Sequence, residues 1–229
     1  MIKQLGWLMG CLFPFLLAAQ EDSLSVEVQV IYQQQPVHVQ EEDTDSTPLD
    51  SIQWNTVQFY LYCQLINNAS PTNSFLPANY KLINLEEKSS QQFKIWKPSN
   101  ANQLQITLGI DQKTSEQGVL GGALDPVNGM YWTWQSGYIN VKLEGIHPSI
   151  STKDKHFSYH LGGYRAPFLA ANTRDFSIQP ACKKVVLKLD LTPFFDLASQ
   201  LTSYRLMSPG QTAVRLSQTL AASISIHEN

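Results

Sequence analysis

Hydrophobic and polar side chains alternate along most of this chain, which is the pattern of strands that bury one face. Near the N-terminal end, Val26, Val28 and Val30 alternate with Glu27 and Gln29. Because successive side chains of a strand point to opposite faces, a period of two over several residues predicts a half-buried strand. The same period recurs in segments 52–65, 93–95, 104–110, 139–143 and 185–191.

Helical spacing is confined to the C-terminal part of the chain. Residues 208–211 read Ser-Pro-Gly-Gln, which predicts a helix with the serine as N-cap and the proline at its first position. Apolar residues follow at helical spacing, so one stripe of this helix can pack on a sheet: Ala213, Leu216 and Leu220. A shorter helical turn beginning at Thr192 would carry two phenylalanines.

Together these patterns predict a mainly β protein, a single-domain antiparallel β-sandwich with a short C-terminal helix. No internal repeat or long linker divides residues 21–229, so we expect one domain over that range. The acidic stretch 41–50 is expected to form an exposed loop between two strands.

The first twenty residues have the order of a secretory signal peptide. Lys3 precedes an apolar run over residues 5–19, which ends in polar and acidic residues. The run is shorter than the roughly 20 apolar residues that a membrane-spanning helix needs. Residues 8–11 also resemble a lipoprotein cleavage box, but the apolar run continues past Cys11. We therefore expect residues 1–20 to be cleaved and the mature protein to be periplasmic or secreted, with no membrane span.

Composition narrows the choice of partners. The chain has 229 residues, of which 15% are charged, and a formal net charge of -3. Charged residues usually make up about a quarter of a soluble protein, so this surface must be covered mainly by neutral polar groups. No cluster of Lys and Arg provides the cationic surface that nucleic acid requires. Nucleic acid is not an expected partner, and the sequence leaves the oligomeric state open.

Two cysteines remain after the predicted cleavage, Cys63 and Cys182. In an oxidising compartment they form either one disulfide or two separate buried thiols, and the sequence favours neither. Their wide separation does not have the spacing of a structural zinc site.

An aromatic and glycine-rich segment occupies the centre of the chain, at residues 118–145. Turn pairs at 125–126 and 128–129 lead into Met130-Tyr131-Trp132-Thr133-Trp134, which we expect to be extended. In a strand, Trp132 and Trp134 would share one face. Spacing alone favours an aromatic core cluster over a binding site, because aromatic side chains contribute most to packing.

A second unusual segment covers residues 156–168 and contains His156 and His160. Phe157, Tyr159 and Leu161 alternate with polar residues, so His160 should point away from the apolar face. Four residues of extended chain separate the two histidines by about 13 Å, which prevents them from holding one metal jointly unless the strand bends.

These two segments carry a family resemblance. Residues 124–145, LDPVNGMYWTWQSGYINVKLEG, resemble the signature of the MbnP-like copper-binding proteins, and residues 160–164, HLGGY, are similar to that family's second motif. The family is related to methanobactin-associated and methanotroph copper-binding surface proteins. The resemblance implies an exported β-sandwich that binds copper through histidine and a tryptophan oxidised to kynurenine. It also implies a dihaem MauG-like partner enzyme that makes this modification.

Carried over by position, His160 matches the histidine of the second motif, and Trp132 and Trp134 match the aromatic signature. Imidazole suits copper, and the Met130 thioether suits Cu(I), so Met130 and His156 are further candidate ligands. No second histidine lies in a matched motif position. The first hypothesis is an exported protein for copper acquisition or handling. The alternative is a β-sandwich interaction module that kept the fold without the metal.

Catalysis is not expected. The sequence contains no nucleophile elbow, phosphate-binding loop or His-Glu-x-x-His motif. A tryptophan that is oxidised by a partner would make this protein a substrate of that enzyme rather than an enzyme.

Overall fold

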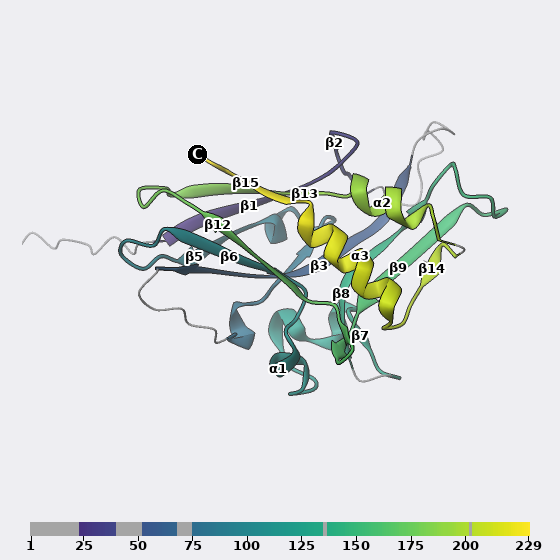
Figure 1. Ribbon diagram of the computed structural model, residues 1–229, viewed down its shortest axis with the longest axis horizontal. Helices are drawn as coiled ribbons and strands as arrows, with labels where there is room; N and C mark the ends of the chain where they lie inside the picture. Colours follow the sequence, from purple (N-terminus) through teal and green to yellow (C-terminus); the bar gives the residue numbers. More distant parts are fainter. Residues whose placement is uncertain (1–22, 40–51, 68–74, 135–136, 202) are drawn as a thin grey trace, which may run out of the picture.

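The computed structural model describes residues 23–39, 52–67, 75–134, 137–201 and 203–229. Strands dominate these ranges, which confirms the prediction of a mainly β fold (Figure 1). The predicted signal peptide at 1–20 and the acidic stretch at 41–50 lie outside the described residues, so both stay predictions.

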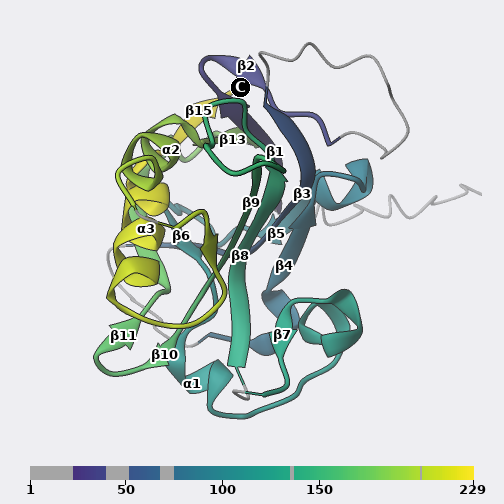
Figure 2. The same ribbon diagram turned by 90° about the vertical axis from the view of Figure 1, so that its right-hand side faces the viewer.

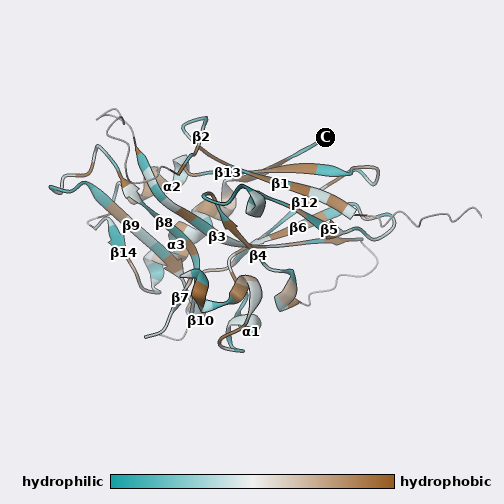
Figure 3. Ribbon diagram, turned by 180° about the vertical axis from the view of Figure 1, so that it is seen from behind, coloured by the Kyte–Doolittle hydropathy of each residue, from teal (hydrophilic) through white to brown (hydrophobic). Residues whose placement is uncertain are grey.

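The smaller sheet of the described chain has five strands in the order β15-β13-β1-β2, with β5 also paired to β1. Its strands are β1 (Ser23–Tyr32), β2 (Gln35–Pro36), β5 (Gln92–Trp96), β13 (Lys184–Asp190) and β15 (Ile224–Glu228). Every second residue over much of β1 and β13 is apolar and belongs to the hydrophobic core, and Figure 3 shows brown, hydrophobic residues along both strands.

The larger sheet has eight strands among the described residues, in the order β12-β6-β3-β8-β9-β14, with β4 paired to β3 and β7 paired to β8. These are β3 (Gln53–Ile66), β4 (Lys81–Asn84), β6 (Gln103–Leu108), β7 (Tyr131–Trp132), β8 (Gly137–Ile146), β9 (His156–Gly162), β12 (Asn172–Ser177) and β14 (Arg205–Leu206). A short hairpin joins β10 (Tyr164–Arg165) to β11 (Phe168–Leu169).

Most strand pairs are antiparallel, as predicted, but two are parallel. β1 runs parallel to β13 over seven residue pairs from Ser25↔Lys184 to Ile31↔Asp190. β14 runs parallel to β9. Alternation alone predicts strands and not their neighbours, and most of the chain lies between β1 and β13, so no hairpin constrains their direction.

A β-bulge explains a change of phase in the sequence of β3. The pairing of β3 with β8 shifts between Trp54 and Thr56. Before the shift the buried residue is even-numbered Trp54, and after it the inward residues are odd-numbered, from Val57 and Phe59 onward. One extra residue returns the apolar side chains to the same face.

The main core lies between the two sheets and is closed by two helices, α2 (Thr192–Ala198) and α3 (Gln211–Ala222). Figure 2 shows α3 lying along one side of the larger sheet, with α2 above it. The turn predicted at Thr192 is confirmed, because α2 buries Phe194 and Phe195. No helix within the described ranges is long and apolar enough to cross a membrane.

The predicted start of the C-terminal helix is wrong by two residues. α3 begins at Gln211, and its N-cap is Gly210, with φ 167° and ψ 175° and no side-chain cap hydrogen bond. Pro209 lies near the backbone of Gly163 instead of occupying the first turn. Ser208 and Pro209 thus lie outside the helix.

The two cysteines are separate buried thiols in the structure. Cys63 lies in β3, where burial raises the pKa of its thiol to about 12. Cys182 lies just before β13, and its Sγ donates to the carbonyl oxygen of Lys184 at 3.2 Å. Of the two interpretations that the sequence left open, the structure therefore shows the pair of free thiols.

A second core covers the outer face of the larger sheet. Tyr60 and Tyr62 of β3 point to this face and are buried there, although the inner face of the same strand is buried as well. The covering segment runs from α1 (Gln112–Ser115) through η3 (Gly122–Leu124) and η4 (Pro126–Asn128) to β7. Figure 1 shows α1 and β7 below the sheet, on the side opposite β15. We call this apolar group the outer cluster: Tyr60, Tyr62, Tyr80, Ile110, Leu124, Met130, Trp132, Tyr138 and Ile139.

Candidate metal centre

The even-numbered residues of β9 line the outer face of the larger sheet. Phe157, Tyr159 and Leu161 point into the main core. His156, Ser158, His160 and Gly162 therefore point outward, because successive side chains of a strand alternate. β9 is continuous over these residues, so His156 and His160 stay about 13 Å apart and do not form one ligand pair. His156 is exposed, whereas His160 is only 8% exposed.

The Trp132 ring packs directly on Gly162. A Cβ atom added to Gly162 would lie 2.7 Å from Cζ3 of Trp132 and 2.5 Å from the backbone oxygen of Tyr138, which leaves no space for a side chain. Gly162 follows His160 by two residues on the same face, so their Cα atoms are about 7 Å apart. The structure thus brings the aromatic segment and the His160 segment together on one face.

The sequence led us to expect Trp132 and Trp134 on one face of a strand. The structure does not place them there. β7 ends at Trp132, and the chain turns at Thr133 and Trp134. Trp132 is 6% exposed and belongs to the outer cluster, whereas Trp134 is 66% exposed. The two rings still contact each other, with centroids 6.0 Å apart. The expected aromatic core cluster therefore includes Trp132 and excludes Trp134.

Met130 is fully buried in the outer cluster. Its backbone oxygen accepts a hydrogen bond from the N–H of Ile139 at 3.0 Å, which fixes this residue to β8. A completely buried thioether among tyrosines and aliphatic side chains has the surroundings of a packing residue.

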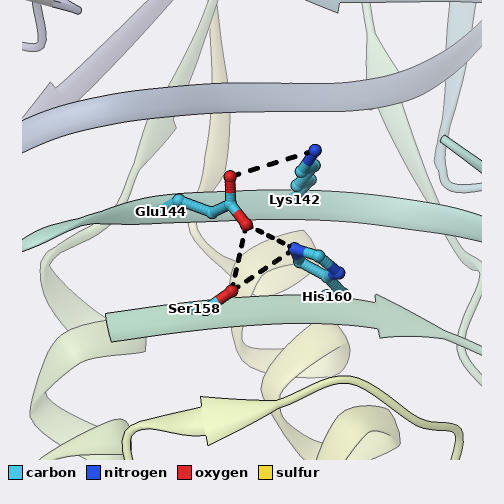
Figure 4. A network of polar contacts seen from close by, with 4 residues as sticks. All are labelled: Lys142, Glu144, Ser158 and His160. Carbon is cyan, nitrogen blue, oxygen red and sulfur yellow. Dashed lines mark hydrogen bonds and ion pairs between the residues drawn. The ribbon is translucent and has the colours of Figure 1, made fainter. Parts of the chain in front are cut away.

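Glu144 is the main polar partner of His160 (Figure 4). Its Oε1 lies 2.8 Å from Nε2 of His160 and accepts a hydrogen bond from Oγ of Ser158 at 3.0 Å. The ammonium group of Lys142 lies 3.9 Å from Oε2. Three neighbouring strand positions of β8 and β9 thus place their polar groups around one carboxylate.

The sequence alone did not identify Glu144 as a partner of His160. Pairing β8 with β9 in the observed register puts Glu144 opposite Ser158 and Lys142 opposite His160. Alternation shows that all four side chains point outward, but only the register shows which of them meet.

Two hollows lie near the candidate site, one lined by Glu144 and the other by Trp132. An open cleft of about 870 Å³ is lined by Glu144, Ser158 and His156, together with Met207 and Arg205. A smaller pocket of about 140 Å³ is lined by Trp132, Tyr164 and Phe168, among others. The polar partners of His160, Glu144 and Ser158, line the open cleft, and Trp132 lines the smaller pocket.

The comparison with protein families agrees with this arrangement. A family model described as MbnP matches residues 21–212, which is most of the 229 residues. The chain belongs to the MbnP family. The match contains both the aromatic segment and the His160 segment, so the expected family is confirmed.

A solved structure has the same fold as this member of the MbnP family. MbnP from Methylosinus trichosporium is similar with a TM-score of 0.54 and 12% sequence identity, over 90% of this chain and 98% of that chain. At this identity the similarity establishes the fold alone. No curated protein matches the chain significantly.

The residues of this MbnP family member fit copper in part. An imidazole is a suitable copper ligand, and the second ring nitrogen of His160 has no hydrogen-bond partner among the described residues. Within the described ranges, however, no group of three or more His, Cys, Asp or Glu side chains is arranged to hold a metal. His160, beside Trp132, is therefore one candidate copper ligand. His156 lies too far from His160 to join it.

The hydrogen bond from His160, followed by the charge of Lys142, outweighs burial and lowers the pKa of Glu144 from 4.5 to about 2. A carboxyl group whose pKa is lower in the folded than in the unfolded protein stabilises the fold at pH values above its unfolded-state pKa. This contribution disappears as the pH falls through its folded-state pKa. Glu144 thus contributes stability above about pH 4.5 that is lost toward pH 2.

We expect Glu144→Gln to unfold in less urea than the unaltered protein at pH 7, and the two midpoints to converge as the pH approaches 2. Urea unfolding followed by circular dichroism over this range measures the difference. The exposed Glu87 provides a matched control, since Glu87→Gln should leave the pH dependence in place. A constant difference between Glu144→Gln and the unaltered protein at all pH values would contradict the assignment.

We expect Gly162→Ala to destabilise the protein by about 1–3 kcal/mol, because the new methyl group overlaps the Trp132 ring and the Tyr138 backbone. Gly121→Ala is the matched control, because no heavy atom lies within 4 Å of a Cβ there. Its effect should stay within about 0.5 kcal/mol. Chemical unfolding measures both, and equal stabilities would show that Trp132 does not rest on Gly162.

Proposed function

We propose that this protein is an exported copper-binding protein whose metal centre is built on His160 beside Trp132. The observation that carries the proposal is the contact of the Trp132 ring with Gly162, two residues from His160 on the same face of β9. Membership of the MbnP family and its resemblance to copper-binding proteins supply the choice of metal. Export rests on the signal-peptide pattern of residues 1–20.

His160 supplies one nitrogen ligand, and the adjacent tryptophan supplies the second part of the proposed site. Oxidation of a tryptophan to kynurenine opens the indole, releases its ring carbon C2 as formate, and creates a ketone and an aromatic amine, which are new donor groups for a metal. Trp132 is the tryptophan that lies on the β9 motif, and Trp134 covers it at a centroid distance of 6.0 Å. The site then combines an imidazole with donors that the unmodified sequence does not contain.

The proposed role is copper acquisition or handling rather than catalysis. The proposed partner is a dihaem MauG-like enzyme, which supplies the oxidising equivalents for the tryptophan. Trp134 is 66% exposed and contacts Trp132, so a docked enzyme can reach the aromatic pair from the surface.

Copper titration of the mature protein tests the metal site. We expect about one equivalent of Cu(I) or Cu(II) to bind, and we expect His160→Ala to weaken that binding at least 10-fold. Removing a residue that hydrogen-bonds to a metal ligand typically lowers metal affinity by about 10–100-fold, and removing the ligand itself should lower it more. His156→Ala is the matched control and should bind copper normally, because His156 lies about 13 Å away along β9. Isothermal titration with metal analysis gives both values.

The alternative, an interaction module without a metal, is favoured by one observation: the described residues contain no group of three or more candidate ligands. Copper binding that is equally strong in the unaltered protein and in His160→Ala would leave this alternative as the better account.

The intact mass of the protein from its native host tests the modification. We expect the gain that corresponds to replacing one carbon by one oxygen, and peptide mapping should assign it to Trp132 or Trp134. The same chain made in a host without a dihaem enzyme is the control and should have the unmodified mass. An unmodified mass in the native host would remove kynurenine from the site.

A further inference from the structure

The carboxylate of Glu144 is held by donors from three side chains. His160 and Ser158 reach its Oε1 at 2.8 and 3.0 Å, and the Lys142 ammonium group lies nearest its Oε2. An ionised carboxylate only accepts hydrogen bonds, so the His160 nitrogen that faces it must carry a proton. Nε2 is that nitrogen.

The proton on Nε2 decides the chemistry of the other ring nitrogen. A neutral imidazole carries one proton, so a proton fixed on Nε2 leaves a lone pair on Nδ1. Figure 4 shows Nδ1 on the side of the ring away from Glu144, toward the C-terminal end of β9. In that direction the next outward position of β9 is Gly162, on which the Trp132 ring rests.

The surroundings of His160 oppose a flipped ring. A 180° flip would put the carbon Cε1 in the place of Nε2 and so remove its contacts to both Glu144 and Ser158, whose Oγ lies 3.4 Å from Nε2. The side chain is largely buried, and its register partner Lys142 lies next to it on β8. The ring orientation is therefore set by the Glu144 contact and by the packing around it.

We propose that Glu144 is a positioning residue that holds His160 with its proton on Nε2 and directs the Nδ1 lone pair toward Trp132, so that copper binds through Nδ1. The part of this proposal that concerns copper rests on the proposed function. The part that concerns the tautomer of His160 does not. Carboxylate partners of this kind orient metal-binding histidines and raise their basicity, and their loss typically lowers metal affinity by about 10–100-fold.

Nitrogen-15 NMR of the copper-free protein at pH 7 tests the tautomer directly. In the unaltered protein, His160 should show a protonated Nε2 and an unprotonated Nδ1. Glu144→Gln removes the negative charge and offers both a donor and an acceptor, so the His160 signals should shift toward the other tautomer. Cu(I) affinity of the same variant, measured by competition with a chromophoric chelator, should fall about 10–100-fold.

Lys142→Gln is the matched control, because Lys142 contacts the same carboxylate but not the imidazole. It should keep the Nε2 proton, and its copper affinity should stay within about 3-fold of the unaltered protein. Circular dichroism confirms that each variant is folded before either measurement is interpreted.

A proton on Nδ1 in the copper-free unaltered protein would overturn the positioning role, as would an unchanged tautomer together with unchanged copper affinity in Glu144→Gln. Failure of the unaltered protein to bind copper would instead overturn the proposed function. The two failures are distinguishable, because the tautomer is measured without copper.

Discussion

The contact between the Trp132 ring and Gly162 is the constraint on which the candidate site depends. Part of the larger sheet is buried on both faces, by the main core inside and by the outer cluster outside. Trp132 is the point at which the outer cluster reaches β9, and Gly162 provides the space for it. Because the ring occupies this position, the next outward residue, His160, lies at the boundary between the apolar cover and the open cleft.

That boundary explains the electrostatics of the site. A largely buried histidine needs a hydrogen-bond partner, and Glu144 provides it to His160 from the neighbouring strand. Glu144 itself is less buried than His160 and is supported by Ser158 and by the charge of Lys142. The pair is thus stable at the edge of the cleft, with one imidazole nitrogen engaged and the other on the side of Trp132. Apolar packing and polar pairing together orient a single side chain.

Alternation in the sequence predicted the strands well, because burying one face imposes a period of two on Val26 to Val30 and on the later segments. It could not predict the parallel partner of β1 or the register that joins Glu144 to His160, since both depend on distant parts of the chain. The motifs identified Trp132 and His160 as candidate site residues. They did not reveal that a turn after Trp132 exposes Trp134, because both residues fit a strand equally well.

In the proposed metal centre, His160 and the residues around Trp132 hold one copper ion together. The most direct measurement is anomalous X-ray diffraction from copper-loaded crystals, recorded on both sides of the copper absorption edge. We predict one copper peak within bonding distance of Nδ1 of His160, on the side of Trp132. A peak at His156 or elsewhere in the open cleft, with no copper at His160, would contradict it.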